Sequence, residues 1–130
     1  MALQNIRVLV AEDNRLVRLG LKLAIESAQD MTLVGAVSNG AEAVSAASDD
    51  RPDVILMDLM MPEMNGIDAT RAIRQAGQAV SIIILTGYSE EEYIEQAFDA
   101  GANRYLVKDV LADELLNAIR DAYNQRAGAT

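Results

Sequence analysis

The sequence predicts an α/β fold in which a five-stranded parallel sheet lies between two layers of helices, a three-layer α/β/α sandwich. Five short apolar runs, rich in β-branched residues, alternate along the chain with five segments in which apolar residues recur at helical spacing. Each connection between successive runs is long enough to hold a helix, so the strands are expected to be parallel with right-handed crossovers. The 130 residues contain no internal repeat, which indicates one domain.

Strands are predicted wherever an apolar run is short and bounded by polar or turn-forming residues. The run from Val80 to Leu85 is the most hydrophobic of the chain, which favours a central strand. The second run contains Gly35, which weakens it and favours a place at the edge of the sheet. The strands are expected at residues 6–11, 32–37, 53–57, 80–85 and 103–107.

Capping residues mark the predicted helix ends. Asn14 has the form of an N-cap, and both Asn39 with Glu42 and Ser89 with Glu92 have the spacing of a capping box. The helices are expected at about residues 14–29, from 39 to the stop at Arg51-Pro52, from 65–66 to 76 with Gly77 as terminator, from 89 to 101, and from 111 to 126.

Composition excludes several classes of chemistry. The chain has no Cys, which excludes disulfides and thiolate chemistry, and it has no His, which removes the usual zinc ligands and the usual general base. Its net charge of -9 argues against contact with nucleic acid and against attachment to an anionic membrane. No long apolar run or signal-like segment is present, so a cytoplasmic location is expected.

Polar residues follow four of the predicted strands, where a parallel sheet gathers them at one edge. Glu12 and Asp13 follow the first strand, Asp58 the third, Thr86 the fourth and Lys108 the fifth. Three carboxylates in one partly buried pocket would repel one another, and a hard cation with oxygen ligands would neutralise them. Mg²⁺ is the expected cation, with Mn²⁺ as a substitute.

This set of groups suits an in-line phosphoryl transfer. That reaction is accelerated mainly by positioning and by neutralising the oxygens of the transferred group, which a cation, an ammonium and a hydroxyl would do here. Asp58, at the centre of the edge, is expected to be the acceptor.

In this order the residues resemble the receiver domain of bacterial two-component response regulators. The resemblance covers about the whole chain, and it is carried by Glu12-Asp13, Asp58 with Met61-Pro62 and Asn65-Gly66, Thr86-Gly87, and Tyr105 with Lys108. It implies a flavodoxin-like receiver fold with strand order 2-1-3-4-5, and that order places Asp13 and Asp58 at the switch point of the sheet.

The resemblance also implies the role of each acidic residue. A sensor histidine kinase or a phosphotransfer protein would phosphorylate Asp58. Asp13, Asp58 and the backbone carbonyl of Met60 would bind Mg²⁺, and Glu12 would hold a metal-bound water. The chain would catalyse only its own phosphorylation and dephosphorylation, and it is not expected to be an enzyme otherwise.

The remaining residues of the resemblance would turn phosphorylation into a change of shape. Lys108 would pair with the phosphoryl group and Thr86 would bond one of its oxygens. Tyr105 would swing inward behind Thr86, so that the two form a switch pair. The surface expected to change comprises the fourth helix, the fifth strand and the fifth helix.

Within this family the chain is similar to the NarL/FixJ group. Residues 16–21 and 105–109 carry this likeness, and members of the group have a C-terminal helix-turn-helix domain that binds DNA. Residues 1–126 are expected to form the receiver domain, and residues 127–130 a tail or the start of a linker to an output domain. A receiver cut from a longer protein is favoured over a stand-alone one, and dimerisation on phosphorylation is a family-level expectation.

One departure from the family pattern and three rival functions stay open. Many receivers have a cis proline after the lysine, whereas Asp109 follows Lys108 here, so a trans bond is expected. An aspartate-nucleophile phosphatase would need a second acid where Met60 stands. A carrier of FMN would need a glycine- and hydroxyl-rich phosphate loop after the first strand, where two acids stand. The third rival is a degenerate receiver that only binds proteins.

Overall fold

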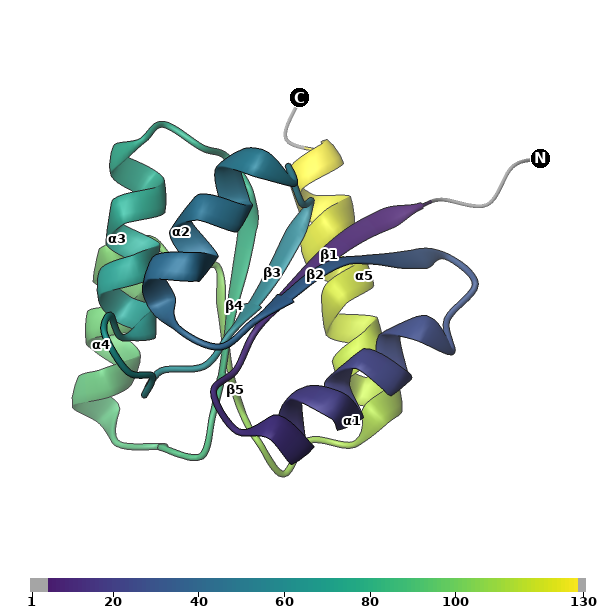
Figure 1. Ribbon diagram of the computed structural model, residues 1–130, viewed down its shortest axis with the longest axis horizontal. Helices are drawn as coiled ribbons and strands as arrows, with labels where there is room; N and C mark the ends of the chain where they lie inside the picture. Colours follow the sequence, from purple (N-terminus) through teal and green to yellow (C-terminus); the bar gives the residue numbers. More distant parts are fainter. Residues whose placement is uncertain (1–4, 129–130) are drawn as a thin grey trace.

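The computed structural model describes the backbone of residues 5–128 and the side chains of residues 5–125 (Figure 1). Its five strands form one parallel sheet in the order β2-β1-β3-β4-β5, as predicted. The strands are β1 (Ile6–Ala11), β2 (Met31–Val37), β3 (Val54–Met57), β4 (Ser81–Thr86) and β5 (Arg104–Val107). The helices are α1 (Arg15–Glu26), α2 (Gly40–Asp49), α3 (Gly66–Gln75), α4 (Glu91–Ala100) and α5 (Ala112–Gly128).

Two layers of helices cover the sheet, which confirms the predicted sandwich. Figure 1 shows α2, α3 and α4 on one face and α1 with α5 on the other. The first layer buries small and branched side chains such as Ala43, Ile73 and Ala97 against the sheet, and the second buries Ile25 and Ile119. Every residue of β3 and β4 is buried, as expected for strands covered on both faces.

β2 lies at the edge of the sheet, as the glycine in its middle predicted. Its pairing with β1 slips by one residue, because Val8 lies opposite Leu33 while Leu9 lies opposite Gly35. A Cβ at position 35 would lie 3.0 Å from the Leu9 side chain, so a glycine allows the close approach.

Three helices begin with asparagine caps, and one predicted cap is wrong. The side chains of Asn14, Asn39 and Asn65 each accept a hydrogen bond from the backbone N–H three residues later. Helix α4 instead starts after Glu90, which makes no capping hydrogen bond, and Ser89 lies one residue before that position. The Ser89–Glu92 spacing therefore matched a capping box that does not form.

Two helices end away from their predicted bounds. Helix α1 stops at Glu26 instead of about residue 29, and the hydroxyl of Ser27 donates to the carbonyl of Ala24 at 2.6 Å, which satisfies an acceptor of the last turn. Helix α5 continues to Gly128, so part of the predicted tail is helical, while residues 129 and 130 lie outside the described residues.

Two further properties of the backbone bear on the sequence-based expectations. The described residues contain no cis peptide bond, so the bond between Lys108 and Asp109 is trans, as predicted. Within the same part of the chain, no helix combines the length and the apolar character needed to cross a membrane.

An ion pair ties the start of β2 to α5. Arg120 donates from Nε to Asp30 Oδ2 at 2.7 Å and from Nη2 to Asp30 Oδ1 at 3.0 Å, a two-pronged arrangement. The hydrogen bonds from Arg120 lower the pKa of Asp30 below its ordinary value. The folded state therefore favours the charged carboxylate.

Asp30→Asn is expected to lower the free energy of unfolding at pH 7 by up to about 1 kcal/mol, because the pair is partly exposed. A depressed carboxyl pKa stabilises the fold above the ordinary Asp value of about 3.9, and this contribution is lost as pH falls through the folded-state pKa. The difference in unfolding free energy between Asp30→Asn and the wild type, measured by urea unfolding, should therefore be smaller in acid than at pH 7. Asp121→Asn, an exposed site on α5, is the control, and a difference independent of pH would contradict the account.

Candidate functional site

The carboxyl ends of the strands meet at one edge of the sheet, and hydrogen bonds just beyond the strands fix the residues there. The backbone N–H of Asp58 donates to the carbonyl of Ala11 at 2.9 Å, and that of Lys108 donates to the carbonyl of Thr86 at 2.8 Å. These bonds extend the β1–β3 and β4–β5 pairings by one step. Glu12, Asp58, Thr86 and Lys108 are therefore placed by the sheet itself.

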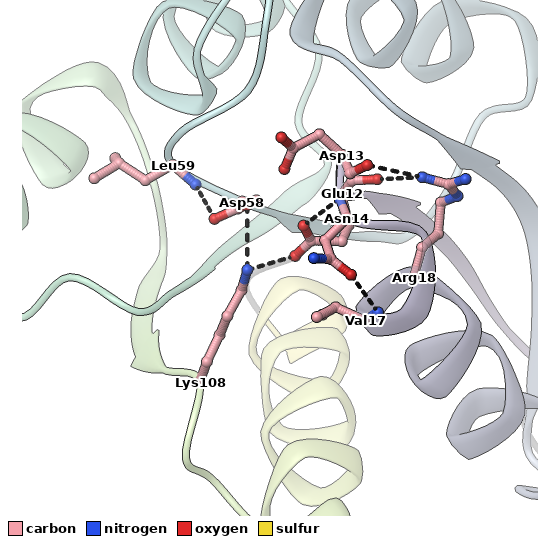
Figure 2. A network of polar contacts seen from close by, with 8 residues as sticks. All are labelled: Glu12, Asp13, Asn14, Val17, Arg18, Asp58, Leu59 and Lys108. Atoms are coloured by element: carbon pink, nitrogen blue, oxygen red, sulfur yellow. Dashed lines mark hydrogen bonds and ion pairs between the residues drawn. The ribbon is translucent and has the colours of Figure 1, made fainter.

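Lys108 lies between two buried carboxylates (Figure 2). Its Nζ is 2.7 Å from Glu12 Oε1 and 3.2 Å from Asp58 Oδ2, and both distances are those of close ion pairs. Glu12 is 1% exposed and Asp58 is 6% exposed, whereas the Lys108 side chain keeps contact with solvent. The ammonium therefore neutralises part of the buried acidic charge while remaining partly exposed itself.

The pKa values of Glu12 and Lys108 are set by burial and by the charges around them. Burial raises the pKa of Glu12, and the nearby charge of Asp58 adds to the effect, although the bonds from Lys108 and Asn14 oppose it. Burial alone would lower the pKa of Lys108, but Glu12 and Asp58 outweigh it and raise that pKa. The ammonium thus stays protonated at neutral pH and remains a fixed cation at the site.

The loop after β3 holds Asp58 from its other side. One carboxylate oxygen, Oδ1, accepts a hydrogen bond from the backbone N–H of Leu59 at 2.8 Å (Figure 2). The loop then folds back, and the N–H of Gly66 donates to the carbonyl of Leu59 at 2.8 Å. A Cβ at position 66 would lie 2.1 Å from the carbonyl oxygen of Asp58, so only glycine permits this return.

Three carboxylates are close enough to share a cation. Glu12, Asp13 and Asp58 each offer an oxygen, and these oxygens lie within 4.8 Å of one another. Asp13 is exposed, whereas the other two are buried. With Lys108, the cluster carries a formal charge of two negative units, which one divalent cation would balance. Oxygen-only donors of this kind fit Mg²⁺, and the residues present are therefore compatible with the expected metal.

The predicted switch residues occupy different environments. Thr86 is fully buried, and its hydroxyl has no hydrogen-bond partner among the described residues. Tyr105 is half-buried, and its hydroxyl donates to the carbonyl of Tyr88 at 2.6 Å. Burial raises the pKa of Tyr105, with smaller contributions from Glu90, Tyr93 and Asp58. An unsatisfied buried hydroxyl beside the acceptor strand is free to take a new acceptor.

Some residues of the site were outside the sequence-based prediction. Arg18 donates from Nη1 to the carbonyl of Glu12 at 2.8 Å, and the backbone N–H of Asn14 donates to Glu12 Oε2 at 3.0 Å. In the sequence, Arg18 stands only as one of residues 16–21, which carry the likeness to the NarL/FixJ group, and nothing there assigned it a role at the site. The side chain of Met60 is 38% exposed, and the role of its carbonyl as a metal ligand stays a prediction.

The chain matches proteins that share both its sequence and its fold. The family model of the response regulator receiver domain matches residues 8–120. The transcriptional regulatory protein YxjL of Bacillus subtilis is 44% identical over 117 residues, which are 90% of this chain and 54% of that protein. The response regulator protein VraR of Staphylococcus saprophyticus is 33% identical over 94% of this chain and 58% of that protein. The chain thus spans little more than half the length of these relatives.

Solved structures give the same result. The signal receiver domain of the response regulator NarL from Mycobacterium tuberculosis superposes with a TM-score of 0.90 at 29% identity, covering 93% of this chain and 98% of that one. The response regulator domain of Thermotoga maritima CheB gives a TM-score of 0.86 at 36% identity over the same shares of the two chains. Similarity to NarL and to LuxR-family regulators confirms the expected subgroup. The chain belongs to the response regulator receiver domain family.

Proposed function

We propose that Asp58 is the residue on which this receiver domain accepts a phosphoryl group. The observation that carries the proposal is the position of its carboxylate, which is buried at a strand end, 3.2 Å from the Lys108 ammonium and next to two further acids. An oxygen of Asp58 would attack phosphorus in line, and the bond from phosphorus to the donor would break with its electron pair leaving on the donor. The product is an acyl phosphate on Asp58.

The other residues of the pocket support this chemistry. Glu12, Asp13 and Asp58, with the carbonyl of Met60, would hold Mg²⁺, which when bound neutralises charge on the transferred phosphoryl oxygens. Lys108 already lies beside the acceptor and would neutralise a further oxygen. The N–H of Leu59 fixes the orientation of the Asp58 carboxylate before any donor arrives.

We further propose that Thr86 and Tyr105 carry the signal away from Asp58. The phosphoryl group would add about 1.5–2 negative charges and three acceptor oxygens, and the unpartnered hydroxyl of Thr86 would bond one of them. Movement of Thr86 would pull the loop between β4 and α4, whose Tyr88 carbonyl is bonded by Tyr105. The surface of α4, β5 and α5 would then change.

The partners follow at the level of the family. A receiver domain implies a kinase partner and a regulated output, and here we propose a sensor histidine kinase or a phosphotransfer protein as donor. Because the chain covers little more than half of its relatives, residues 127–130 are proposed to lead into an output domain, with transcription as the output. Homodimerisation on phosphorylation, the lack of direct nucleic-acid contact and a cytoplasmic location stay predictions.

A degenerate receiver that only binds proteins is the second candidate, and a direct chemical test separates it from the first. The chain would be incubated with acetyl phosphate, a small phosphodonor, and its intact mass measured with Mg²⁺ and with excess EDTA. One phosphoryl adduct in Mg²⁺ and none in EDTA is the expected result. A folded chain that forms no adduct in either buffer would favour the binding module, and an adduct insensitive to EDTA would contradict the proposed metal site.

A further inference from the structure

Helix α1 differs from every other helix in the charge of its first turn. The first turns of α2, α3, α4 and α5 all contain acids, which suit the positive end of the helix dipole. The first turn of α1 has no acid and contains Arg15 and Arg18 instead. A cation at this end opposes the dipole, and an interaction outside the helix can offset that cost.

Arg18 makes such interactions with the loop that follows β1. Its Nη1 donates to the carbonyl of Glu12 at 2.8 Å and, in a longer contact of 3.4 Å, to the carbonyl of Asp13 (Figure 2). The side chain is partly buried, whereas that of Arg15 is exposed. One guanidinium nitrogen therefore contacts the backbone of two consecutive residues, Glu12 and Asp13, whose carboxylates cluster with that of Asp58.

The same loop is fixed from its other end. The N–H of Asn14 donates to Glu12 Oε2, and the side chain of Asn14 caps α1 through the N–H of Val17. Side-chain and backbone bonds thus restrain residues 12–14, and Arg18 supplies the only side-chain donor to the carbonyls of Glu12 and Asp13 among the described residues. Losing it would leave the position of Asp13, the exposed acid, less restrained.

We propose that Arg18 is a positioning residue for cation binding: it holds the β1–α1 loop so that the carboxylates of Glu12 and Asp13 are presented together toward Asp58. The inference rests on the proposed Mg²⁺ site. Arg18 has two effects on cation binding, and they have opposite signs, so the proposal can be tested. As a charge, Arg18 repels a cation and weakens its binding, while as a brace for the loop it favours binding.

The sign of the change in Mg²⁺ affinity separates the two effects. Isothermal titration calorimetry with MgCl₂ alone, without a phosphodonor, would compare the wild type with Arg18→Gln, Arg18→Lys and Arg15→Gln. Arg18→Gln is expected to bind Mg²⁺ about tenfold more weakly than the wild type, because the β1–α1 loop loses its side-chain support. A loss of this size is typical when groups that hold the metal-ligating residues in place are removed. Arg18→Lys keeps the charge without the planar fork and should be intermediate. Arg15→Gln removes the same charge from the exposed neighbour and should bind as well as the wild type or slightly better.

Phosphorylation rates then exclude a merely structural role. With acetyl phosphate, Arg18→Gln should need about tenfold more Mg²⁺ for its half-maximal rate, yet reach the wild-type rate when Mg²⁺ saturates. Arg18→Gln that binds Mg²⁺ as tightly as the wild type, or more tightly, would overturn the inference, as would a rate that stays low at saturation. A wild type that binds no Mg²⁺ would overturn the proposed metal site itself, a failure distinct from these two.

Discussion

Asp58→Asn is expected to leave no phosphoryl adduct on the chain under conditions in which the wild type is fully modified. The amide that replaces the carboxylate is a poor nucleophile, and it also removes one of the three acids of the proposed metal site. Intact-mass measurement after treatment with acetyl phosphate and Mg²⁺ detects the difference directly. The loss of signal should be complete because the proposed reaction has a single acceptor.

A matched control keeps this result specific. Asp49→Asn makes the same chemical change at the exposed end of α2, and we expect it to be phosphorylated like the wild type. An adduct of undiminished size on Asp58→Asn would contradict the assignment and would move attention to Glu12 or Asp13. Circular dichroism of each variant confirms that the comparison is between folded chains.

Gly66→Ala is expected to destabilise the protein by at least about 2 kcal/mol, although it adds a single methyl group. The new Cβ would lie 2.1 Å from the carbonyl oxygen of Asp58 and 3.0 Å from its carbonyl carbon. These neighbours are backbone atoms and cannot rotate away, so the loop after β3 must shift. Urea unfolding would measure the loss, and the rate of phosphorylation should fall with it because the acceptor moves with its backbone.

Gly20→Ala is the control for this prediction. Gly20 lies on the exposed side of α1, and a Cβ there would meet nothing within 4 Å. Removing a glycine from a helix interior is expected to stabilise by about 0.5–1 kcal/mol. The two substitutions should therefore have opposite signs. If Gly66→Ala proved as stable as the wild type, the close approach that holds the Asp58 loop would be wrong.

The sheet was predictable because its signals are strong and local. Each strand lies within one residue of its predicted bounds, since a short apolar run between polar residues has few other ways to be buried. The start of α4 was not predictable in this way, because the spacing of Ser89 and Glu92 carries no information about contacts with residues distant in sequence. The hydroxyl of Tyr105, distant in sequence, holds the Tyr88 carbonyl just before Ser89, and the helix starts after Glu90.

Some features of the candidate site could likewise be predicted from the sequence, and others could not. The topology of a parallel sheet brings together Glu12, Asp58 and Lys108, so their proximity was predictable without any knowledge of the loops. The contacts of Arg18 and the need for glycine at position 66 depend on how two loops fold back. No periodicity in the sequence encodes those paths. Gly66 and the segment that contains Arg18 carry the family resemblance in the sequence, but the contacts that each makes became visible only in the structure.

The central claim, that phosphorylation of Asp58 acts through Thr86, is tested most directly by amide hydrogen exchange on the phosphorylated chain. Wild type, Thr86→Ser and Thr86→Ala would be compared with and without acetyl phosphate and Mg²⁺, each with its adduct verified by mass. Phosphorylation is expected to slow exchange in residues 87–91 of the wild type and of Thr86→Ser, which keeps the hydroxyl. In Thr86→Ala the adduct should form while this change is lost. The same slowing in Thr86→Ala, or no change in the phosphorylated wild type, would contradict the account.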